Sequence, residues 1–117
     1  MMKIIIAGGR SFDDYNLLSK KCDAILINQK DIEIVSGHAK GADSLGEKYA
    51  IERNYGLKLF PADWTLGKKA GYIRNAEMAK YGDALIAFWD GKSKGTANMI
   101  KLAETNGLKI RVIRFDK

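Results

Sequence analysis

The 117-residue sequence has few of the residues that build metal and disulfide sites, with one cysteine, Cys22, and one histidine, His38. A single cysteine cannot form an internal disulfide, and one cysteine with one histidine cannot supply a structural zinc site. Cys22 stands at helical spacing from Leu18 and Leu26, so we expect it in the hydrophobic core. Disulfide scaffolds and zinc-thiolate sites are therefore excluded.

The sequence also lacks a long hydrophobic run near its start and contains one proline. The apolar run at 4–7 is too short for a secretion signal or a membrane span, so we expect a cytoplasmic protein with no membrane partner. The hydrophobic content of 46% and charged content of 29% are those of an ordinary folded protein. This length fits a single domain over 1–117, and we find no linker or repeat.

The net charge of +6, from 20 basic and 14 acidic residues, permits a nucleic-acid or polyphosphate partner. The basic residues are spread along the chain, as they are on an ordinary solvated surface. Charge alone therefore does not select a partner.

Strand and helix patterns alternate along the whole chain. Short apolar runs predict strands at 3–7, 33–36, 58–60, 84–89 and 109–115. Helical spacing predicts helices at 15–28, 41–54, 68–81 and 97–105, the first behind a capping box of Ser11 and Asp14. The runs at 3–7 and 84–89 are the most apolar and belong in the middle. We therefore predict a Rossmann-like three-layer α/β/α fold with a five-stranded parallel sheet in the order 3-2-1-4-5.

Glycine-rich loops follow the first, second and fourth predicted strands. Glycine lets the backbone approach a ligand closely, and free N–H groups at the start of the next helix attract an anion. One such loop alone is typical of a simple turn, but ligands of parallel sheets bind where strand order reverses, and all three loops meet there. They predict a phosphate-binding crevice. Its loop residues are Gly8, Gly9, Arg10, Ser11, Ser36, Gly37, Lys40, Gly41, Ala42, Asp43, Asp90, Gly91, Ser93, Gly95 and Thr96.

Common nucleotide motifs do not match these loops. The segment 91–96 has no lysine after its second glycine, so it is not a P-loop, and the segment 8–10 is not a dinucleotide-binding fingerprint. Ordinary NTPase chemistry is therefore disfavoured.

The loops and the helix predicted at 68–81 together resemble the SLOG superfamily. The resemblance lies in Gly8-Gly9-Arg10-Ser11-Phe12, in Ser36-Gly37 through Gly41-Ala42-Asp43, in Ala62-Asp63-Trp64 with 67–75, and in Phe88-Trp89-Asp90-Gly91 through Gly95-Thr96. It covers nearly the whole chain and is nearest to the small YspA-like, cpYpsA-related branch, a stand-alone Rossmann-like domain of bacteria and phages. It implies binding of nucleotides or nucleotide-derived ligands. Relatives include the Lonely Guy phosphoribohydrolases and the DNA-binding DprA proteins.

The Lonely Guy enzymes use an arginine in their third helix and a glutamate three residues after the final Gly-Thr. Arg74 matches the arginine, but the glutamate position holds Met99, and Asn75 stands where those enzymes have lysine. A thioether cannot act as an acid or base or stabilise an oxocarbenium-like transition state. The resemblance therefore argues against that activity while keeping the phosphate site.

If the protein is an enzyme, we expect a nucleotide N-glycosidic or phosphoester hydrolase in which Asp90, Arg74 and Asp43 are the catalytic residues. Asp90 directly follows a central strand, and Arg74 would stabilise developing negative charge. Asp43 and Asp90 could instead hold ribose hydroxyls or a hydrated Mg²⁺. Asp43 also has a simpler explanation, because the helix dipole favours a negative charge in the first turn of a helix.

The remaining site candidates each have a simpler explanation. Asp63, Trp64, Asn75 and Trp89 complete the predicted ligand site, and the tryptophans could stack a base, although aromatic residues at strand ends more often serve packing. His38 could be a general acid or base, but a loop histidine without a visible partner is usually only solvated. Glutamates 47, 77 and 104 lie a helical turn or more from their loops, a poor approach to the ligand.

Two functions from different classes follow from the sequence. The first is a nucleotide-binding domain that acts as a sensor or a hydrolase, and the second is a single-stranded nucleic-acid binding module related to DprA. Tight basic loops that fit one ligand favour the first. We also expect a homodimer, because the relatives are commonly dimeric and Trp64, Tyr72 and Trp89 would lie near one end of the sheet.

Overall fold

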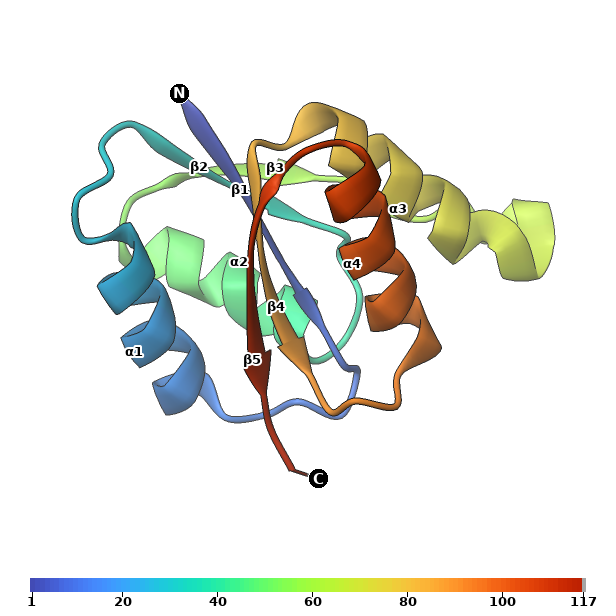
Figure 1. The fold of residues 1–117 in the computed structure, drawn as a ribbon, viewed down its shortest axis with the longest axis horizontal. Coiled ribbons are helices and arrows are strands. Elements are labelled where there is room, and N and C mark those ends of the chain that lie inside the picture. The colour runs from blue at the N-terminus through green and yellow to red at the C-terminus, as the bar shows by residue number, and fades with distance from the viewer. Residues whose placement is uncertain (117) are drawn as a thin grey trace.

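The computed structural model of the protein describes residues 1–116. Its sheet consists of β1 (Met2–Gly8), β2 (Ile32–Ser36), β3 (Gly56–Leu59), β4 (Ala84–Trp89) and β5 (Lys109–Arg114). All paired strands are parallel, in the order β3-β2-β1-β4-β5 (Figure 1). The predicted strand order is confirmed, and strand order reverses at β1, whose neighbours β2 and β4 lie on opposite sides.

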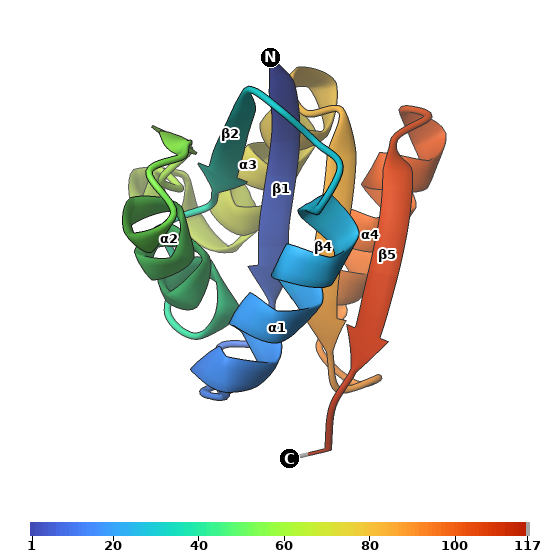
Figure 2. The ribbon, with the colours of Figure 1, turned by 90° about the vertical axis from the view of Figure 1, so that its left-hand side faces the viewer.

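Four α-helices cover the two faces of the sheet, so the predicted three-layer fold is confirmed. They are α1 (Tyr15–Leu26), α2 (Ala42–Glu52), α3 (Ala70–Tyr81) and α4 (Lys94–Thr105). A 3₁₀ segment, η1 (Trp64–Lys69), precedes α3. Helices α1 and α2 lie on one face and α3 and α4 on the other, as Figures 1 and 2 show.

The alternation of side chains along β1 divides the core between these two faces. Ile4 and Ile6 pack with α1 and α2, whereas Ile5 and Ala7 pack with α3 and α4. Cys22 is fully buried in the first cluster, as predicted, and burial raises the pKa of its thiol to about 12. None of the helices in the described part of the chain has the length and apolarity that a membrane crossing requires.

The predicted start of the first helix at residue 15 is confirmed, but its capping residue and the bounds of the later helices differ from the prediction. Helix α1 begins at Tyr15 behind Asp14, whose Oδ1 accepts from the Leu17 N–H at 3.0 Å, so Ser11 is not its cap. Helix α1 ends at Leu26, two residues early, and α4 starts three residues before Ala97, because Ser93 caps it. The helix predicted from Lys68 starts as an α-helix only at Ala70, because the preceding residues form η1, in which Gly67 has a non-helical φ of 80°.

Candidate functional site

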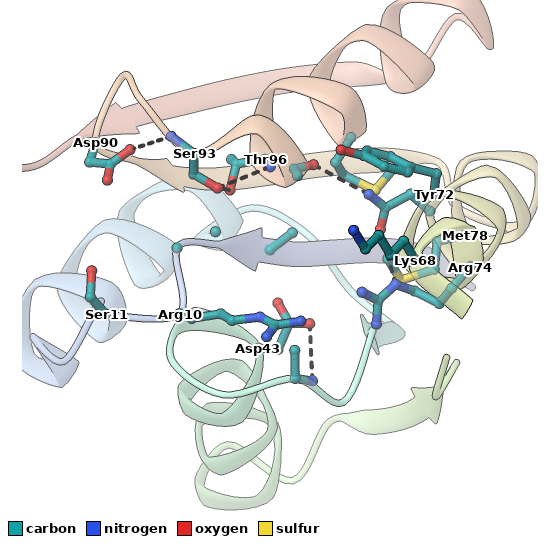
Figure 3. Close-up of a pocket in the computed structure, with 18 of the residues that line it drawn as sticks. Arg10, Ser11, Asp43, Lys68, Tyr72, Arg74, Met78, Asp90, Ser93 and Thr96 are labelled. Carbon is teal, nitrogen blue, oxygen red and sulfur yellow. Dashed lines mark hydrogen bonds between the residues drawn. The ribbon is translucent and has the colours of Figure 1, made fainter. Parts of the chain in front are cut away.

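A cleft of about 630 Å³ opens at the carboxyl ends of β1 and β4 and is walled by α3 and the start of α4 (Figure 3). It lies at the reversal of strand order, where ligands of doubly wound sheets bind. Its lining includes the predicted residues Gly8, Gly9, Arg10, Ser11, Asp43, Trp64, Arg74, Asn75, Asp90, Ser93, Gly95 and Thr96. The chain thus brings together residues from four segments far apart in sequence.

Two of the predicted glycine loops are packed backbone against backbone at one side of the cleft. The Ala42 N–H donates to the Gly9 carbonyl oxygen at 3.2 Å, and Gly41 has a positive φ of 78°. A side chain at Gly41 would collide with the Gly9 carbonyl group, and one at Gly8 would lie 2.8 Å from the Cβ of Ala42. Gly41 and Ala42 therefore hold the loops together and do not line the cleft.

Arg74 and Asn75 of α3 are both buried, and they tie three segments together at the cleft wall. The Arg74 guanidinium donates to the carbonyl oxygen of Gly37 and, at 3.0 Å, to Oδ1 of Asn75. The Asn75 amide in turn donates to the carbonyl oxygen of Gly95 at 3.3 Å and to Oδ1 of Asn98 at 3.1 Å. Burial lowers the pKa of Arg74, which nevertheless stays charged. No residue in 1–116 accepts from its Nη2, so this group can donate to a ligand.

Asp43 is a buried carboxyl group in the cleft wall, with an exposed fraction of 5%. Burial raises its pKa to about 6, and the charges of Arg74 and Arg10 and a 3.3 Å hydrogen bond from the Ala39 N–H act in the opposite direction. A carboxyl group with this pKa changes its protonation close to neutral pH. It can therefore take up or release a proton beside a bound ligand.

Asp90 lies on the opposite side of the cleft and organises the turn before α4. Its Oδ1 accepts from the backbone N–H groups of Lys92 and Ser93, both at 2.8 Å, and these bonds lower its pKa. A carboxylate that is held ionised and already bonded is a weak candidate for a general acid or base. The geometry instead gives Asp90 a role in fixing the turn.

The start of α4 keeps fewer free donors than the sequence predicts. The Thr96 N–H donates to the Ser93 hydroxyl at 3.3 Å, and the Ser93 N–H is bonded to Asp90. Ser93 and Thr96 hydroxyls lie 3.1 Å apart. Among residues 1–116, no acceptor pairs with the N–H groups of Lys94 and Gly95, so these two are available to an anion.

A profile of the YspA, cpYpsA-related SLOG family matches residues 2–67, more than half of the chain. The gene 61 protein of Mycobacterium phage D29 is 32% identical over an alignment of 118 positions that covers 94% of each chain. The chain belongs to the YspA, cpYpsA-related SLOG family. Family membership agrees with the resemblance seen in the sequence and indicates nucleotide-related binding in general. The family match ends within η1 and does not include α3 or α4. What is said of these two helices therefore rests on the structure of this protein alone.

Several predicted ligand residues of this SLOG protein lie outside the large cleft and have structural partners. Asp63 caps η1 by accepting from the Thr65 N–H at 3.1 Å. The Trp89 indole donates to the Ser93 carbonyl oxygen at 3.0 Å, and Gly91 has a φ of 83° beside Arg114. Ser36, Gly37 and Lys40 also lie outside this cleft, with Gly41 and Ala42.

Sequence reasoning missed several residues that line the cleft. Gly71, Tyr72 and Met78 flank Asn75 at helical spacing on α3, so this spacing could have identified them once Asn75 was chosen. Ala7, Ala39, Lys68 and Met99 complete the missed set. Met99 is buried in the wall of the cleft, so the wall is apolar at this position.

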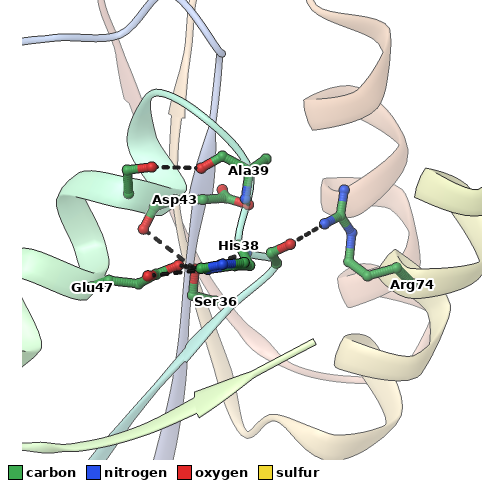
Figure 4. Close-up of polar contacts among 8 residues, drawn as sticks. Ser36, His38, Ala39, Asp43, Glu47 and Arg74 are labelled. Atoms are coloured by element: carbon green, nitrogen blue, oxygen red, sulfur yellow. Dashed lines mark hydrogen bonds and ion pairs between the residues drawn. The ribbon is translucent and has the colours of Figure 1, made fainter. Parts of the chain in front are cut away.

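A second, smaller cavity of about 440 Å³ shares the wall formed by Arg10, Trp64 and Arg74. Ala39 also lines both cavities, and the remaining residues of the smaller one are Gly37, His38, Lys40, Pro61 and Ala62. The sequence shows no partner for His38, but in the structure its Nδ1 lies 2.9 Å from Oε2 and 3.2 Å from Oε1 of Glu47 (Figure 4). Glu47 lines neither cavity, but one turn of α2 brings its side chain back to the loop that carries His38.

Among residues 1–116, no three His, Cys, Asp or Glu side chains gather into a group that could hold a metal ion. Asp43 and Asp90 are the only carboxylates among the residues that line the large cleft. Mg²⁺ usually enters nucleotide sites through one or two carboxylates and the ligand's own phosphates. Any such ion would therefore depend on the bound ligand.

Proposed function

We propose that the large cleft binds a nucleotide or nucleotide-derived ligand, whose phosphate lies between Arg10, Arg74 and the start of α4. The observation that carries this proposal is the convergence of two arginines and the start of α4, where the N–H groups of Lys94 and Gly95 are unpaired, on one cleft at the reversal of strand order. A phosphate is the anion that best uses both kinds of donor, because arginine matches its oxygens and a helix start favours its charge.

The size and chemistry of the cleft suit a whole nucleotide. Ligand sites for small molecules have volumes of about 300–1,000 Å³, and this one has about 630 Å³. Trp64 and Tyr72 stand at the cleft with exposed fractions of 56% and 46%, so their rings can cover a base. The guanidinium carbon of Arg10 lies 5.8 Å from the centre of the Trp64 ring, so the cation and the aromatic ring are close together at the cleft.

Native mass spectrometry of the purified protein tests this proposal first, because a retained nucleotide would be identified by its mass. Isothermal titration with nucleoside mono- and diphosphates, ADP-ribose and NAD then ranks the ligands. Arg74→Ala should weaken the best ligand at least about tenfold, as expected for loss of a charged hydrogen bond. Lys30→Ala, a change of an exposed lysine outside both cavities, is the control. Absence of binding to the whole panel would contradict the proposal.

Exposed Trp64 and Tyr72 with Lys68 and Lys69 nearby also support the second candidate, a single-stranded nucleic-acid binding surface. Aromatic side chains stack on bases of any sequence, and lysines pair with the backbone phosphates. A salt titration separates the two functions. An oligonucleotide that contacts several phosphates loses affinity steeply with salt, whereas a single nucleotide loses little.

A further inference from the structure

The pair of His38 and Glu47 is arranged as an oriented base at the smaller cavity. The Nδ1 of His38 lies 2.9 Å from Oε2 of Glu47, and that same oxygen accepts from the Ser36 hydroxyl at 2.8 Å (Figure 4). The His38 N–H is held by the Ser36 hydroxyl at 3.1 Å, so ring and backbone are fixed by one cluster. A carboxylate at Nδ1 selects the tautomer whose lone pair is on Nε2.

The Nε2 of His38 is free to act on a ligand. None of residues 1–116 forms a hydrogen bond with it; His38 is one of the residues that line the cavity, and 53% of its side chain is exposed. Arg10, Lys40 and Arg74 line the same cavity. A proton acceptor is thus placed in a cavity whose other charged residues are cations.

These cations favour one reaction class over another. Cleavage of an N-glycosidic bond develops positive charge on the sugar, which neighbouring cations destabilise. Attack on phosphorus develops negative charge on the phosphoryl oxygens or the leaving group, which cations stabilise. The smaller cavity is therefore suited to phosphoryl transfer to water.

We infer that His38, oriented by Glu47, is the general base for hydrolysis of a nucleoside diphosphate whose terminal phosphoryl group enters the smaller cavity. This inference rests on the proposed nucleotide site, because the nucleotide would lie in the large cleft and its phosphates would cross the shared wall of Arg10 and Arg74. His38 would be the catalytic residue and Glu47 a positioning residue.

The reaction balances with water alone. The water oxygen forms a bond to the terminal phosphorus while one water proton moves to Nε2 of His38. The bridging P–O bond breaks, and its electron pair stays on the oxygen of the nucleoside monophosphate. His38 then returns the proton to solvent. Arg10, Lys40 and Arg74 stabilise the negative charge on the phosphoryl oxygens.

The test compares hydrolysis and binding of ADP by the wild type, His38→Asn and Glu47→Gln. His38 has a φ of 60°, a conformation that asparagine adopts readily, and an asparagine amide can still donate to Glu47 from the region of Nδ1. His38→Asn therefore lacks only the Nε2 atom that would accept the proton from water. We expect about a hundredfold or greater loss of phosphate release with the ADP affinity retained.

Glu47→Gln separates positioning from simple folding effects. We expect it to lower kcat more than it changes KM, because the amide no longer orients the imidazole as the carboxylate does, while the residues that contact the nucleotide are unchanged. Glu104→Gln, at an exposed site on α4, is the matched control and should leave both unchanged. This comparison of kcat with KM also decides the matter if His38→Asn fails to fold.

Hydrolysis is measured as the amount of phosphate released, once with Mg²⁺ and once with EDTA. A second assay measures how much heavy oxygen from labelled water enters the released phosphate. Wild type that binds ADP but releases no phosphate overturns this inference and leaves the proposed nucleotide site standing. So does unchanged hydrolysis by His38→Asn, which would place the base elsewhere. Failure to bind any nucleotide rejects the proposed function itself, and with it this inference.

Discussion

The Arg74 side chain donates a hydrogen bond to the main-chain carbonyl of Gly37, so a buried residue of α3 fixes the turn that follows β2. A side chain at Gly37 would lie 2.5 Å from Nη1 of Arg74 and 2.8 Å from Oδ2 of Asp43, so this glycine gives both groups the space they occupy. The large cleft and the smaller cavity share Arg74, and this bond therefore holds both in shape.

Replacing Arg74 by lysine should weaken both the fold and ligand binding. An ammonium group keeps the charge but cannot reproduce a planar guanidinium that bonds the Gly37 carbonyl and the Asn75 amide together. We expect the free energy of unfolding to fall by about 1–3 kcal/mol, the typical effect of leaving a buried polar partner unsatisfied. Urea denaturation measures it, with Arg111→Lys on the exposed face of β5 as the control. Equal midpoints for the two variants would contradict this role.

The sequence was sufficient to predict the strand order and the place of the large cleft, because both follow from hydrophobic runs and from glycine loops behind them. It was insufficient for the side-chain pairing within the loops. Asp90 looks catalytic in the sequence, but its carboxylate is bonded to the Lys92 and Ser93 N–H groups. His38 and Glu47 are nine residues apart and look unrelated, yet a turn of helix brings them together.

The predicted homodimer stays a proposal, and the structure changes the surface that would form it. Trp89 is partly buried by its own loop, whereas Trp64, Leu66, Tyr72 and Ile73 expose between 40% and 56% of their surface on η1 and α3. Exposed apolar side chains gathered on one surface are typical of interfaces. Tyr72→Glu should shift sedimentation at tens of micromolar from dimer toward monomer, while Ile51→Glu, on α2, should not. A wild-type monomer with ligand bound would reject the dimer.

A proline at Lys94 tests whether helix N–H groups of α4 bind the anion. Lys94 is the first residue of α4, where proline is well tolerated, and Ser93 before it has φ −59° and ψ 118°, a conformation compatible with a following proline. Lys94→Pro removes one N–H and one charge, while Lys94→Ala removes the charge alone. We expect the proline variant to bind sulfate about tenfold more weakly than the alanine variant, about 1.4 kcal/mol, by calorimetry at constant ionic strength. Equal affinities would place the anion elsewhere.

The raised pKa of Asp43 predicts a dependence of stability on pH with a definite sign. The carboxyl group has a pKa of about 6 in the fold and 3.8 ordinarily, so the folded protein holds this proton more tightly than the unfolded chain. Its contribution to stability is therefore fully present below about pH 3.8 and declines as the pH rises through about 6. The decline is on the order of 3 kcal/mol, from the difference between the two pKa values.

Replacing Asp43 by asparagine removes this titration while keeping the size of the side chain and an acceptor for the Ala39 N–H. The free energy of unfolding of the wild type should therefore fall relative to that of Asp43→Asn between about pH 4 and about pH 7, and Glu104→Gln should follow the wild type throughout. Sulfate keeps its charge over this range, so its affinity for the wild type should rise as the pH is lowered through about 6, because protonation removes a negative charge from the cleft. Denaturation curves and sulfate titrations at matched ionic strength measure both effects. Parallel curves for the wild type and Asp43→Asn would show that Asp43 is not protonated in this range and would remove it as a proton carrier in the cleft.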